Sequence, residues 1–231
     1  MFKSLLENKY LSWMQIFTNW LMQGILHADK SEKSYKILFT VFFWMIFFSF
    51  LYFGLNSTFL LSLLVSFISA HTLNWMLNCN FSVLFVHRMK WRKTSKDKLF
   101  DQLFEIRNRF EEIINKEWIL YSVSHGGICR GTLNEHSDID VSIIRKPGLK
   151  NFMKAAIFYV KEKKRADLKG VPLDIFICDT PENCIQRSKG QNNPIVIFDP
   201  WNKIDVFYPQ KLKITIEDAQ VLNEVSRNVK Y

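Results

Sequence analysis

The feature that most constrains this chain is an uncharged run from Ile37 to Leu55, with the sequence ILFTVFFWMIFFSFLYFGL. A helix needs about 20 consecutive apolar residues to cross the hydrocarbon core of a bilayer. A short polar turn at residues 56–58 follows this run, and Phe59 to Leu77 supplies a second apolar stretch. The sequence therefore predicts two transmembrane helices joined as a tight hairpin.

Basic residues flank both outer ends of this hairpin, whereas its turn has none. Lys30, Lys33 and Lys36 precede it, and a basic cluster follows it, consisting of Arg88, Lys90, Arg92, Lys93, Lys96 and Lys98. The positive-inside rule places both termini, and with them the rest of the chain, in the cytoplasm. Anionic lipid headgroups attract such a cluster. The net charge of +9 is therefore assigned to a membrane surface and not to a nucleic acid.

The segment before the hairpin, residues 11–26, is apolar but interrupted by polar residues, which predicts a helix lying at the membrane interface. Trp13, Phe17, Trp20 and Leu21 would form its lipid-facing side. A helix docked on a globular fold gives a similar pattern, and this alternative stays open.

Three polar residues share one face of the second apolar helix, namely His71, Asn74 and Asn78. One interpretation is that they hydrogen-bond to other helices and hold a bundle or a homo-oligomer together. The other is that they bind a lipid-linked headgroup. The first is favoured because polar residues commonly join helices in membranes.

The four cysteines, Cys79, Cys129, Cys178 and Cys184, contain no CxxC pair and no spacing typical of a zinc site. They are interpreted as buried small residues in a reducing compartment.

The rest of the chain alternates helical and extended patterns. Residues 99–116 read as an amphipathic helix that links membrane and soluble parts. Strands are expected at 118–124, 138–144 and 171–178, a helix at 151–165, and a hairpin within 192–209 around the turn at 199–202. The expected divisions are an interfacial region at 1–36, the hairpin at 37–86, the basic segment and linking helix at 87–116, and a catalytic domain at 117–231.

The chemistry is concentrated in the segment SHGGICRGTLNEHSDIDVSII. Asp138 and Asp140 alternate with apolar residues, so both carboxylates are expected on one face of a strand. Two adjacent carboxylates repel each other unless a cation lies between them, and carboxylate oxygens suit magnesium. Gly126 and Gly127 allow a close backbone approach to phosphates, and Arg130 adds a positive fork for them.

This pattern resembles the DNA polymerase beta-like nucleotidyltransferase superfamily, in which a strand and a G-G or G-S turn precede D-x-D. It is most similar to small members that read G-S-x-A-R-G followed by S-D-I-D, here with Ser137 before the aspartates. The resemblance covers about residues 118–178. It implies an α+β core, a mixed sheet with flanking helices, preceded by the helical hairpin.

The resemblance also implies roles for individual residues. Asp138, Asp140 and Asp174 would be the catalytic carboxylates and would hold one or two Mg²⁺ ions, with Asp174 on the acceptor side. Gly126, Gly127, Arg130 and Ser137 would bind a nucleoside triphosphate such as ATP.

The chain departs from the family pattern at three positions. Gly127 stands where serine is common, Cys129 where alanine is common, and His125 where the residue is usually apolar. His125 either contacts a phosphate or only ends the strand. The basic run at 161–165 is interpreted as a solvated helix end, and Glu135 and His136 as loop surface.

The sequence therefore predicts a membrane-anchored nucleotidyltransferase that acts on a lipid-linked or membrane-associated acceptor, in cell-envelope glycan or glycolipid assembly. Two alternatives remain. One is a protein-modifying enzyme of the toxin and antitoxin kind. The other is a non-catalytic membrane scaffold that retains the fold.

Overall fold

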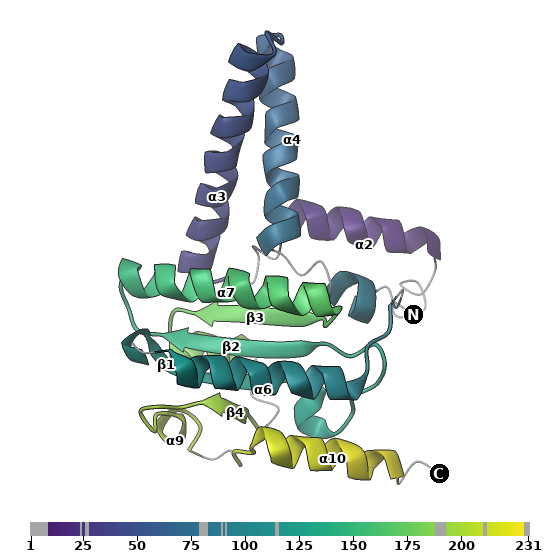
Figure 1. The fold of residues 1–231 in the computed structure, drawn as a ribbon, viewed down its shortest axis with the longest axis vertical. Coiled ribbons are helices and arrows are strands. Elements are labelled where there is room, and N and C mark those ends of the chain that lie inside the picture. Colours follow the sequence, from purple (N-terminus) through teal and green to yellow (C-terminus); the bar gives the residue numbers. More distant parts are fainter. Residues whose placement is uncertain are drawn as a thin grey trace. The chain divides into compact units, whose positions relative to one another are not determined.

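The computed structural model describes residues 9–23, 25, 28–78, 83–88, 90, 92–113, 116–187, 193–209 and 212–228 (Figure 1). The chain divides into two compact units, Met1–Phe81 and Ser82–Tyr231. Cys79, which is expected to be buried, and the end of the expected interfacial helix at residue 26 lie outside the described residues.

The first unit consists of helices. They are α2 (Lys9–Met22), α3 (Lys30–Ser49), which continues into the π-helical turn η2 (Phe50–Gly54), and α4 (Phe59–Asn78). Two helices, Lys30–Gly54 and Phe59–Asn78, are long and apolar enough to cross a membrane by length and composition. In the most apolar 18-residue segment of each helix, 0% of the residues of Lys30–Gly54 and 28% of those of Phe59–Asn78 are buried. The core helix of a soluble protein, by contrast, is mostly buried.

The packing of α3 against α4 follows from a stripe of small and polar residues on α4. The buried residues recur every four positions, at Ser62, Ser66, Ala70, Asn74 and Asn78. Small side chains let two helix backbones approach closely where no hydrophobic driving force acts between them. The large apolar residues of α4, such as Leu64 and Ile68, are left exposed on its outer side.

The polar residues of α4 hydrogen-bond to α3, to α2 and to Gln23, which directly follows α2. Asn74 Nδ2 donates to Gln23 Oε1 at 2.7 Å and to Thr40 Oγ1 at 3.0 Å, and Asn78 Nδ2 donates to Asn74 Oδ1 at 2.8 Å. His71 Nε2 lies 3.0 Å from the carbonyl oxygen of Trp20. The favoured interpretation of this face, as a connection between helices, therefore agrees with the structure.

The same contacts correct the expected lipid-facing side of the first helix. Phe17 and Leu21 are exposed as predicted, but Trp20 faces α4, because its Nε1 donates to Thr72 Oγ1 at 3.1 Å and its ring meets His71 edge-on. The side chain of Trp13 lies outside the described residues.

The second unit is an α+β domain whose elements alternate along the chain. They are η3 (Leu84–Arg88), α6 (Lys96–Glu112), η4 (Lys116–Trp118), β1 (Ile119–His125), η5 (Ile128–Arg130), β2 (Ile139–Arg145), α7 (Leu149–Lys169), β3 (Leu173–Cys178), α8 (Pro181–Arg187), β4 (Ile195–Phe198), α9 (Ile204–Phe207) and α10 (Ile216–Asn228).

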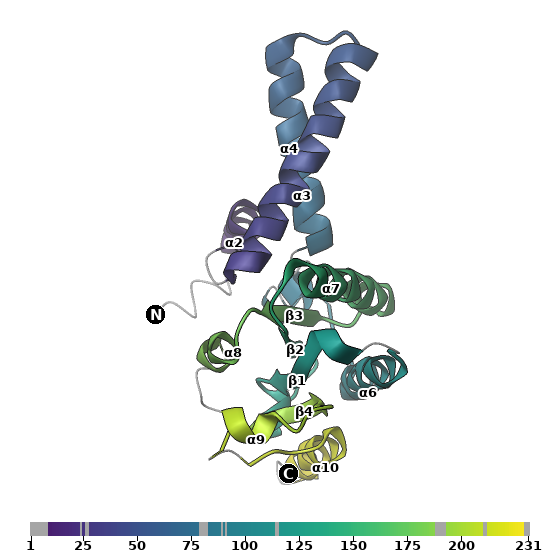
Figure 2. The same ribbon diagram turned by 90° about the vertical axis from the view of Figure 1, so that its left-hand side faces the viewer.

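The sheet of this unit has the order β3-β2-β1-β4. Strands β2 and β3 are parallel, and the other pairs are antiparallel. Helices α6 and α7 cover one face and α8 and α9 the other (Figure 2). The main core lies under α6 and α7, where Leu103, Ile106 and Phe110 pack against alternate residues of the strands. The expected mixed sheet with flanking helices is confirmed.

Several expected boundaries are wrong. The linking helix begins at Lys96, because Ser95 Oγ accepts a hydrogen bond from Lys98 N, and it ends at Glu112 instead of 116. The expected helix at 151–165 extends to Lys169. Within its basic run, Glu162 and Lys163 are buried and therefore not part of a solvated end.

The hairpin expected within residues 192–209 is also wrong. Its first arm is β4, which pairs with β1. The second arm is the short helix α9, because the carboxylate of Asp199 accepts hydrogen bonds from the backbone N of Lys203 at 2.9 Å and of Ile204 at 3.0 Å. A carboxylate that caps these N–H groups favours a helical turn over a strand.

Candidate active site

The register of the sheet brings the predicted carboxylates together. Asp140 pairs with Asp174 across β2 and β3, and with His125 across β1 and β2. Because Ile139 and Val141 pack into the core under α6 and α7, the alternate residue Asp140 points to the opposite face. Asp138 lies immediately before β2, which begins at Ile139 and not at 138 as expected.

The three aspartates are close enough for their charges to affect one another. The pKa of Asp140 is raised well above its ordinary value, first by burial and then by the negative charges of Asp138 and Asp174. The positive charge of Arg130 opposes this rise. A carboxylate that is buried beside like charges is costly to ionise unless a cation neutralises it.

The three aspartates form the donor set for the expected magnesium. As the side chains stand, no group of three or more His, Cys, Asp or Glu residues in the described ranges is arranged to hold a metal ion. Nevertheless, Asp138, Asp140 and Asp174 supply the oxygen ligands that Mg²⁺ prefers. Their mutual repulsion is what a divalent cation relieves, so the chemistry of the three residues fits the ion.

The glycine turn approaches Asp140 closely. Gly126 has φ +90°, and a Cβ atom there would lie 2.9 Å from Asp140 Oδ2. Gly127 has φ −62°, an ordinary conformation, and its carbonyl oxygen accepts hydrogen bonds from the backbone N of Arg130 and of Thr132. Only the short 3-10 turn η5 follows, so no long helix begins at the turn. Phosphate binding by Gly126, Gly127 and Arg130 stays a prediction.

Sequence reasoning missed Asn223, which fixes the segment after the glycine turn. Its Nδ2 donates to the carbonyl oxygens of Ile128 and Ala219, each at 2.8 Å, and its Oδ1 accepts from Leu133 N at 3.2 Å. Asn223 is 1% exposed. A buried asparagine that bonds to backbone from both ends of its amide holds Ile128–Leu133, and with it Arg130, in place. The single signal in the sequence is a polar residue on the apolar side of α10.

The turn that precedes Asp138 is held by the basic segment after η3. Thr94 N donates to the carbonyl oxygen of Glu135 at 2.8 Å, and Lys93 Nζ lies 2.9 Å from the carboxylate of Glu135. This lysine lowers the pKa of Glu135. Ser137 Oγ accepts from Asn134 N at 2.9 Å and so closes the turn. A nucleotide-binding role of Ser137 stays a prediction.

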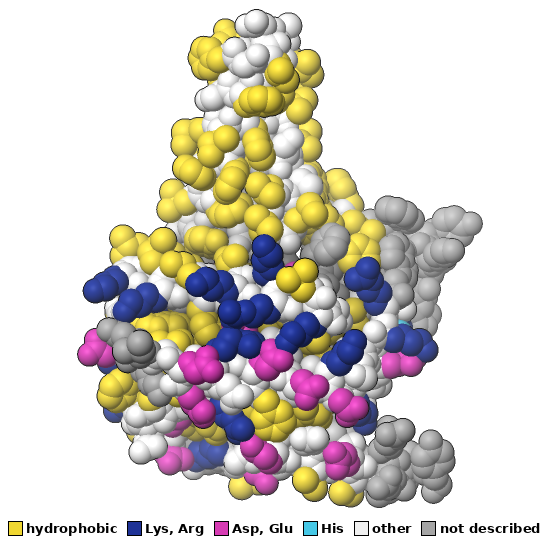
Figure 3. All heavy atoms as spheres, viewed as in Figure 1, with side chains coloured by type: hydrophobic (Ala, Val, Ile, Leu, Met, Phe, Trp, Pro, Cys, Tyr) yellow, Lys and Arg dark blue, Asp and Glu magenta, His cyan; other side chains and the backbone are white. Residues whose placement is uncertain are grey.

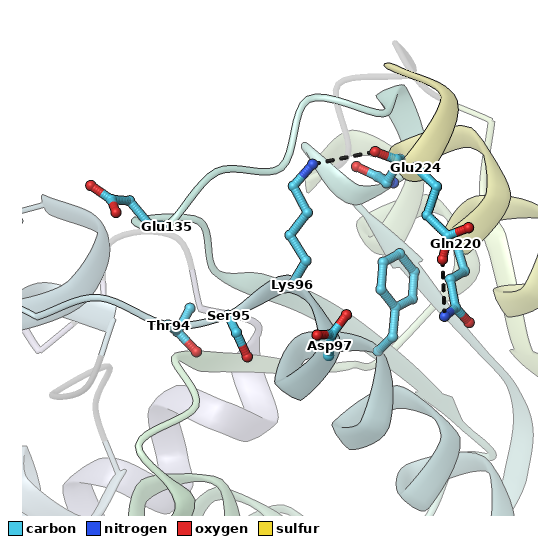
Figure 4. Close-up of a pocket in the computed structure, with 9 residues that line it drawn as sticks. Thr94, Ser95, Lys96, Asp97, Glu135, Gln220 and Glu224 are labelled. Carbon is cyan, nitrogen blue, oxygen red and sulfur yellow. Dashed lines mark hydrogen bonds between the residues drawn. The ribbon is translucent and has the colours of Figure 1, made fainter. Parts of the chain in front are cut away.

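A pocket of about 530 Å³ lies between the start of α6, the turn before Asp138 and α10 (Figure 4). Lys96 reaches across it to the carbonyl oxygen of Asn223 at 3.3 Å, and Gln220 Nε2 donates to Glu224 Oε1 at 3.4 Å. None of the three aspartates lines it. Its lining includes Glu135 and Asn223, two of the residues that position the site.

His125 and Cys129, two of the departures from the family pattern, are buried. His125 ends β1, is 6% exposed, and has its ring centroid 6.1 Å from that of Tyr208. Hydrogen bonding with Cys178, and after it with His125, lowers the pKa of the Cys184 thiol to about 5. Cys129 Sγ donates to Ser124 O at 3.3 Å, and burial raises the pKa of its thiol to about 12. Cys129 is therefore an uncharged packing residue, whereas a phosphate contact of His125 stays a prediction.

The comparison with known families agrees with this geometry. The family model described as the nucleotidyltransferase domain matches residues 107–220, which include all the strands, the glycine turn and the three aspartates. This match confirms the polymerase beta-like resemblance. A search of the curated proteins finds no match to the chain.

Proposed function

Since residues 107–220 are a nucleotidyltransferase domain, we propose that this chain is a membrane-anchored, magnesium-dependent enzyme that moves a nucleoside monophosphate from a nucleoside triphosphate to a lipid-linked or membrane-associated acceptor. The observation that supports catalysis is the register that places Asp140 beside Asp174, with Asp138 adjacent and Gly126 against Asp140. A scaffold that only retained the fold would have no need for three mutually repelling carboxylates side by side.

The chain's own residues have separate tasks in this proposal. Asp138 and Asp140 would hold magnesium, and the ion would supply positive charge to neutralise the phosphoryl group and the leaving pyrophosphate. Arg130 and the backbone of Gly126 and Gly127 bind the triphosphate. Asp174, the neighbour of Asp140 on β3, orients the acceptor hydroxyl or accepts its proton.

The two apolar helices support a membrane location. The basic residues on both sides of the hairpin support a cytoplasmic location of the termini and the domain, by the positive-inside rule. The acceptor is therefore expected on the cytoplasmic surface, as in the assembly of cell-envelope glycans or glycolipids.

The test is to incubate detergent-purified full-length protein with each labelled nucleoside triphosphate, Mg²⁺ and membrane extract, and to separate lipid, protein and soluble products. Label in lipid supports the proposal, and label in protein supports a protein-modifying enzyme instead. Asp138→Asn and Asp174→Asn serve as matched variants, with Asp101→Asn on the exposed side of α6 as the control. Transfer by Asp138→Asn at the rate of the control would contradict the metal role.

A further inference from the structure

The outer face of α7 carries an exposed apolar ridge. Leu149, Met153 and Ile157 are 76%, 48% and 52% exposed. Their spacing of four residues places them on one side of the helix. The opposite side of α7 is buried in the core by Ala155, Tyr159 and Ala166. The exposed ridge is therefore not needed for the folding of the domain.

Basic side chains lie along the same face. Lys150 and Lys154 each follow a residue of the apolar ridge, and Lys161 and Lys164 continue the face toward the end of the helix. Among the described residues these four lysines form no ion pair. The acid between them, Glu162, is buried and pairs with Arg109 and Arg165. Figure 3 shows Lys and Arg side chains gathered over α7.

Helix α10 provides a contrast within the same domain. It also exposes large apolar residues, Val221 and Val225, at 58% and 53%. Among its side chains that the structure describes, the exposed charges are acidic, at Glu217, Asp218 and Glu224. The two helices therefore differ in the sign of the charge that accompanies their apolar residues, and an anionic surface would attract α7 and repel α10.

We propose that α7 docks on the anionic surface of the bilayer, with Leu149, Met153 and Ile157 among the lipid headgroups and the four lysines against the lipid phosphates. An apolar ridge beside lysines is the chemistry by which helices lie in a membrane interface. The inference rests on the membrane anchoring in the proposed function, since the hairpin keeps the domain at a high effective concentration beside the bilayer.

Docking through α7 is compatible with catalysis. This helix connects β2 to β3, the two strands that carry Asp140 and Asp174. It covers the face of the sheet opposite to those aspartates (Figure 2). Lipid contact on the outer side of α7 therefore holds the catalytic strands at the membrane and does not cover the face of the sheet that carries the aspartates.

The test places a fluorophore on α7 or on α10 of the full-length protein, through Met153→Cys or through the matched control Val221→Cys. The protein is reconstituted into vesicles of neutral lipid or of neutral lipid mixed with phosphatidylglycerol, each containing brominated acyl chains that quench only nearby probes. Protein without an introduced cysteine measures the background labelling of the native cysteines.

We expect loss of most of the fluorescence at position 153 in anionic vesicles, little loss in neutral vesicles or at high salt, and little loss at position 221 in any vesicle. Lys150→Gln with Lys154→Gln should restore the fluorescence at position 153. Equal quenching at both positions, or equal quenching in both lipids, would overturn the proposal. So would binding of an RNA oligonucleotide by α7 without lipid quenching. None of these readouts depends on nucleotidyl transfer, so a failure here and an inactive enzyme are distinguishable.

Discussion

Gly126 and Gly127 are neighbours in the sequence, but only the first needs to be glycine. Gly126 has a left-handed φ of +90° and leaves no room for a Cβ atom beside Asp140 Oδ2, whereas Gly127 has φ −62°. A Cβ at Gly127 would meet Thr132 Oγ1 at 3.4 Å, which is an ordinary contact. This explains why small members of the family can carry serine at the second position.

Alanine should therefore reduce activity at Gly126 and have little effect at Gly127. Gly126→Ala forces strain of about 1–3 kcal/mol at the residue that contacts Asp140, and we expect pyrophosphate release to fall by at least about tenfold. Gly127→Ala should keep near-normal activity and a stability within about 1 kcal/mol of the parent. Pyrophosphate release and thermal unfolding of both variants are the measurements. Equal activity of the two would contradict the close approach to Asp140.

The charge of Asp140 should destabilise the domain when no cation is bound. Its pKa is higher in the folded state than in the unfolded state, so ionisation favours unfolding. The penalty is absent below the unfolded pKa and grows as the pH rises through the folded pKa. Each pH unit by which the pKa is raised corresponds to about 1.4 kcal/mol.

Asp140→Asn should consequently raise the melting temperature at neutral pH in chelator and remove much of the stabilisation that Mg²⁺ gives the parent protein. In the parent, lowering the pH toward the unfolded pKa of aspartate should relieve the same penalty. The control is Asp101→Asn, which changes an exposed carboxylate on α6. Melting curves with EDTA and with Mg²⁺ provide the test. If Asp140→Asn melted at a lower temperature than the parent protein in EDTA, repulsion among the aspartates would not contribute significantly to the free energy of unfolding.

Residues of the site differ in how far the sequence could predict them. The positions of Asp138, Asp140, Gly126 and Gly127 follow from local spacing, because strand periodicity and backbone freedom act over a few residues. Asn223 could not be predicted, since its partners Ile128 and Leu133 are about 90 residues away along the chain. Contacts of that kind depend on tertiary packing, which a single sequence does not encode in a local pattern.

At the scale of elements, the apolar runs predicted helices α3 and α4 well but not the side by which they meet. That side is the stripe from Ser62 to Asn78 on α4, with small residues toward the turn and polar residues toward the other end. The four-residue spacing of small and polar residues identifies this stripe. The mean hydropathy of the helix does not, because the large apolar residues on its other sides dominate the average. The misassigned second arm of the 192–209 hairpin has a different cause, namely the side-chain cap by Asp199.

The stripe predicts which substitution the hairpin does not tolerate. Ser66 is fully buried between the two helices, whereas its neighbour Val65 is exposed. Ser66→Leu inserts volume where the backbones approach, and overpacking of this kind costs about 1–3 kcal/mol. Val65→Leu should be close to neutral. Resistance of the detergent-solubilised protein to unfolding by added SDS measures the difference, and equal resistance of the two variants would place the helix contact elsewhere.

At the scale of the whole molecule, the division into two units agrees with the uneven composition of the sequence. The first unit exposes large apolar side chains along α3 and α4, which is unfavourable in water and favourable in lipid. The second unit has a buried core and a charged surface. The first unit is therefore expected to fold in lipid and the second in water, with the boundary near the basic cluster that follows the hairpin.

The topology is the prediction that belongs to this scale. Because the turn of the hairpin has no basic residue while both outer ends do, the turn is expected outside the cell and the domain inside. Thr58→Cys in the turn should react with a membrane-impermeant maleimide on intact cells, whereas Asp101→Cys, exposed on α6, should react only after permeabilisation. Cys129, Cys178 and Cys184 are buried and form no disulfide among the described residues, and the parent protein measures the remaining background. Reaction of Asp101→Cys on intact cells would place the domain on the outer side of the membrane. It would then face a solution without nucleoside triphosphates, which would remove the basis for the proposed activity.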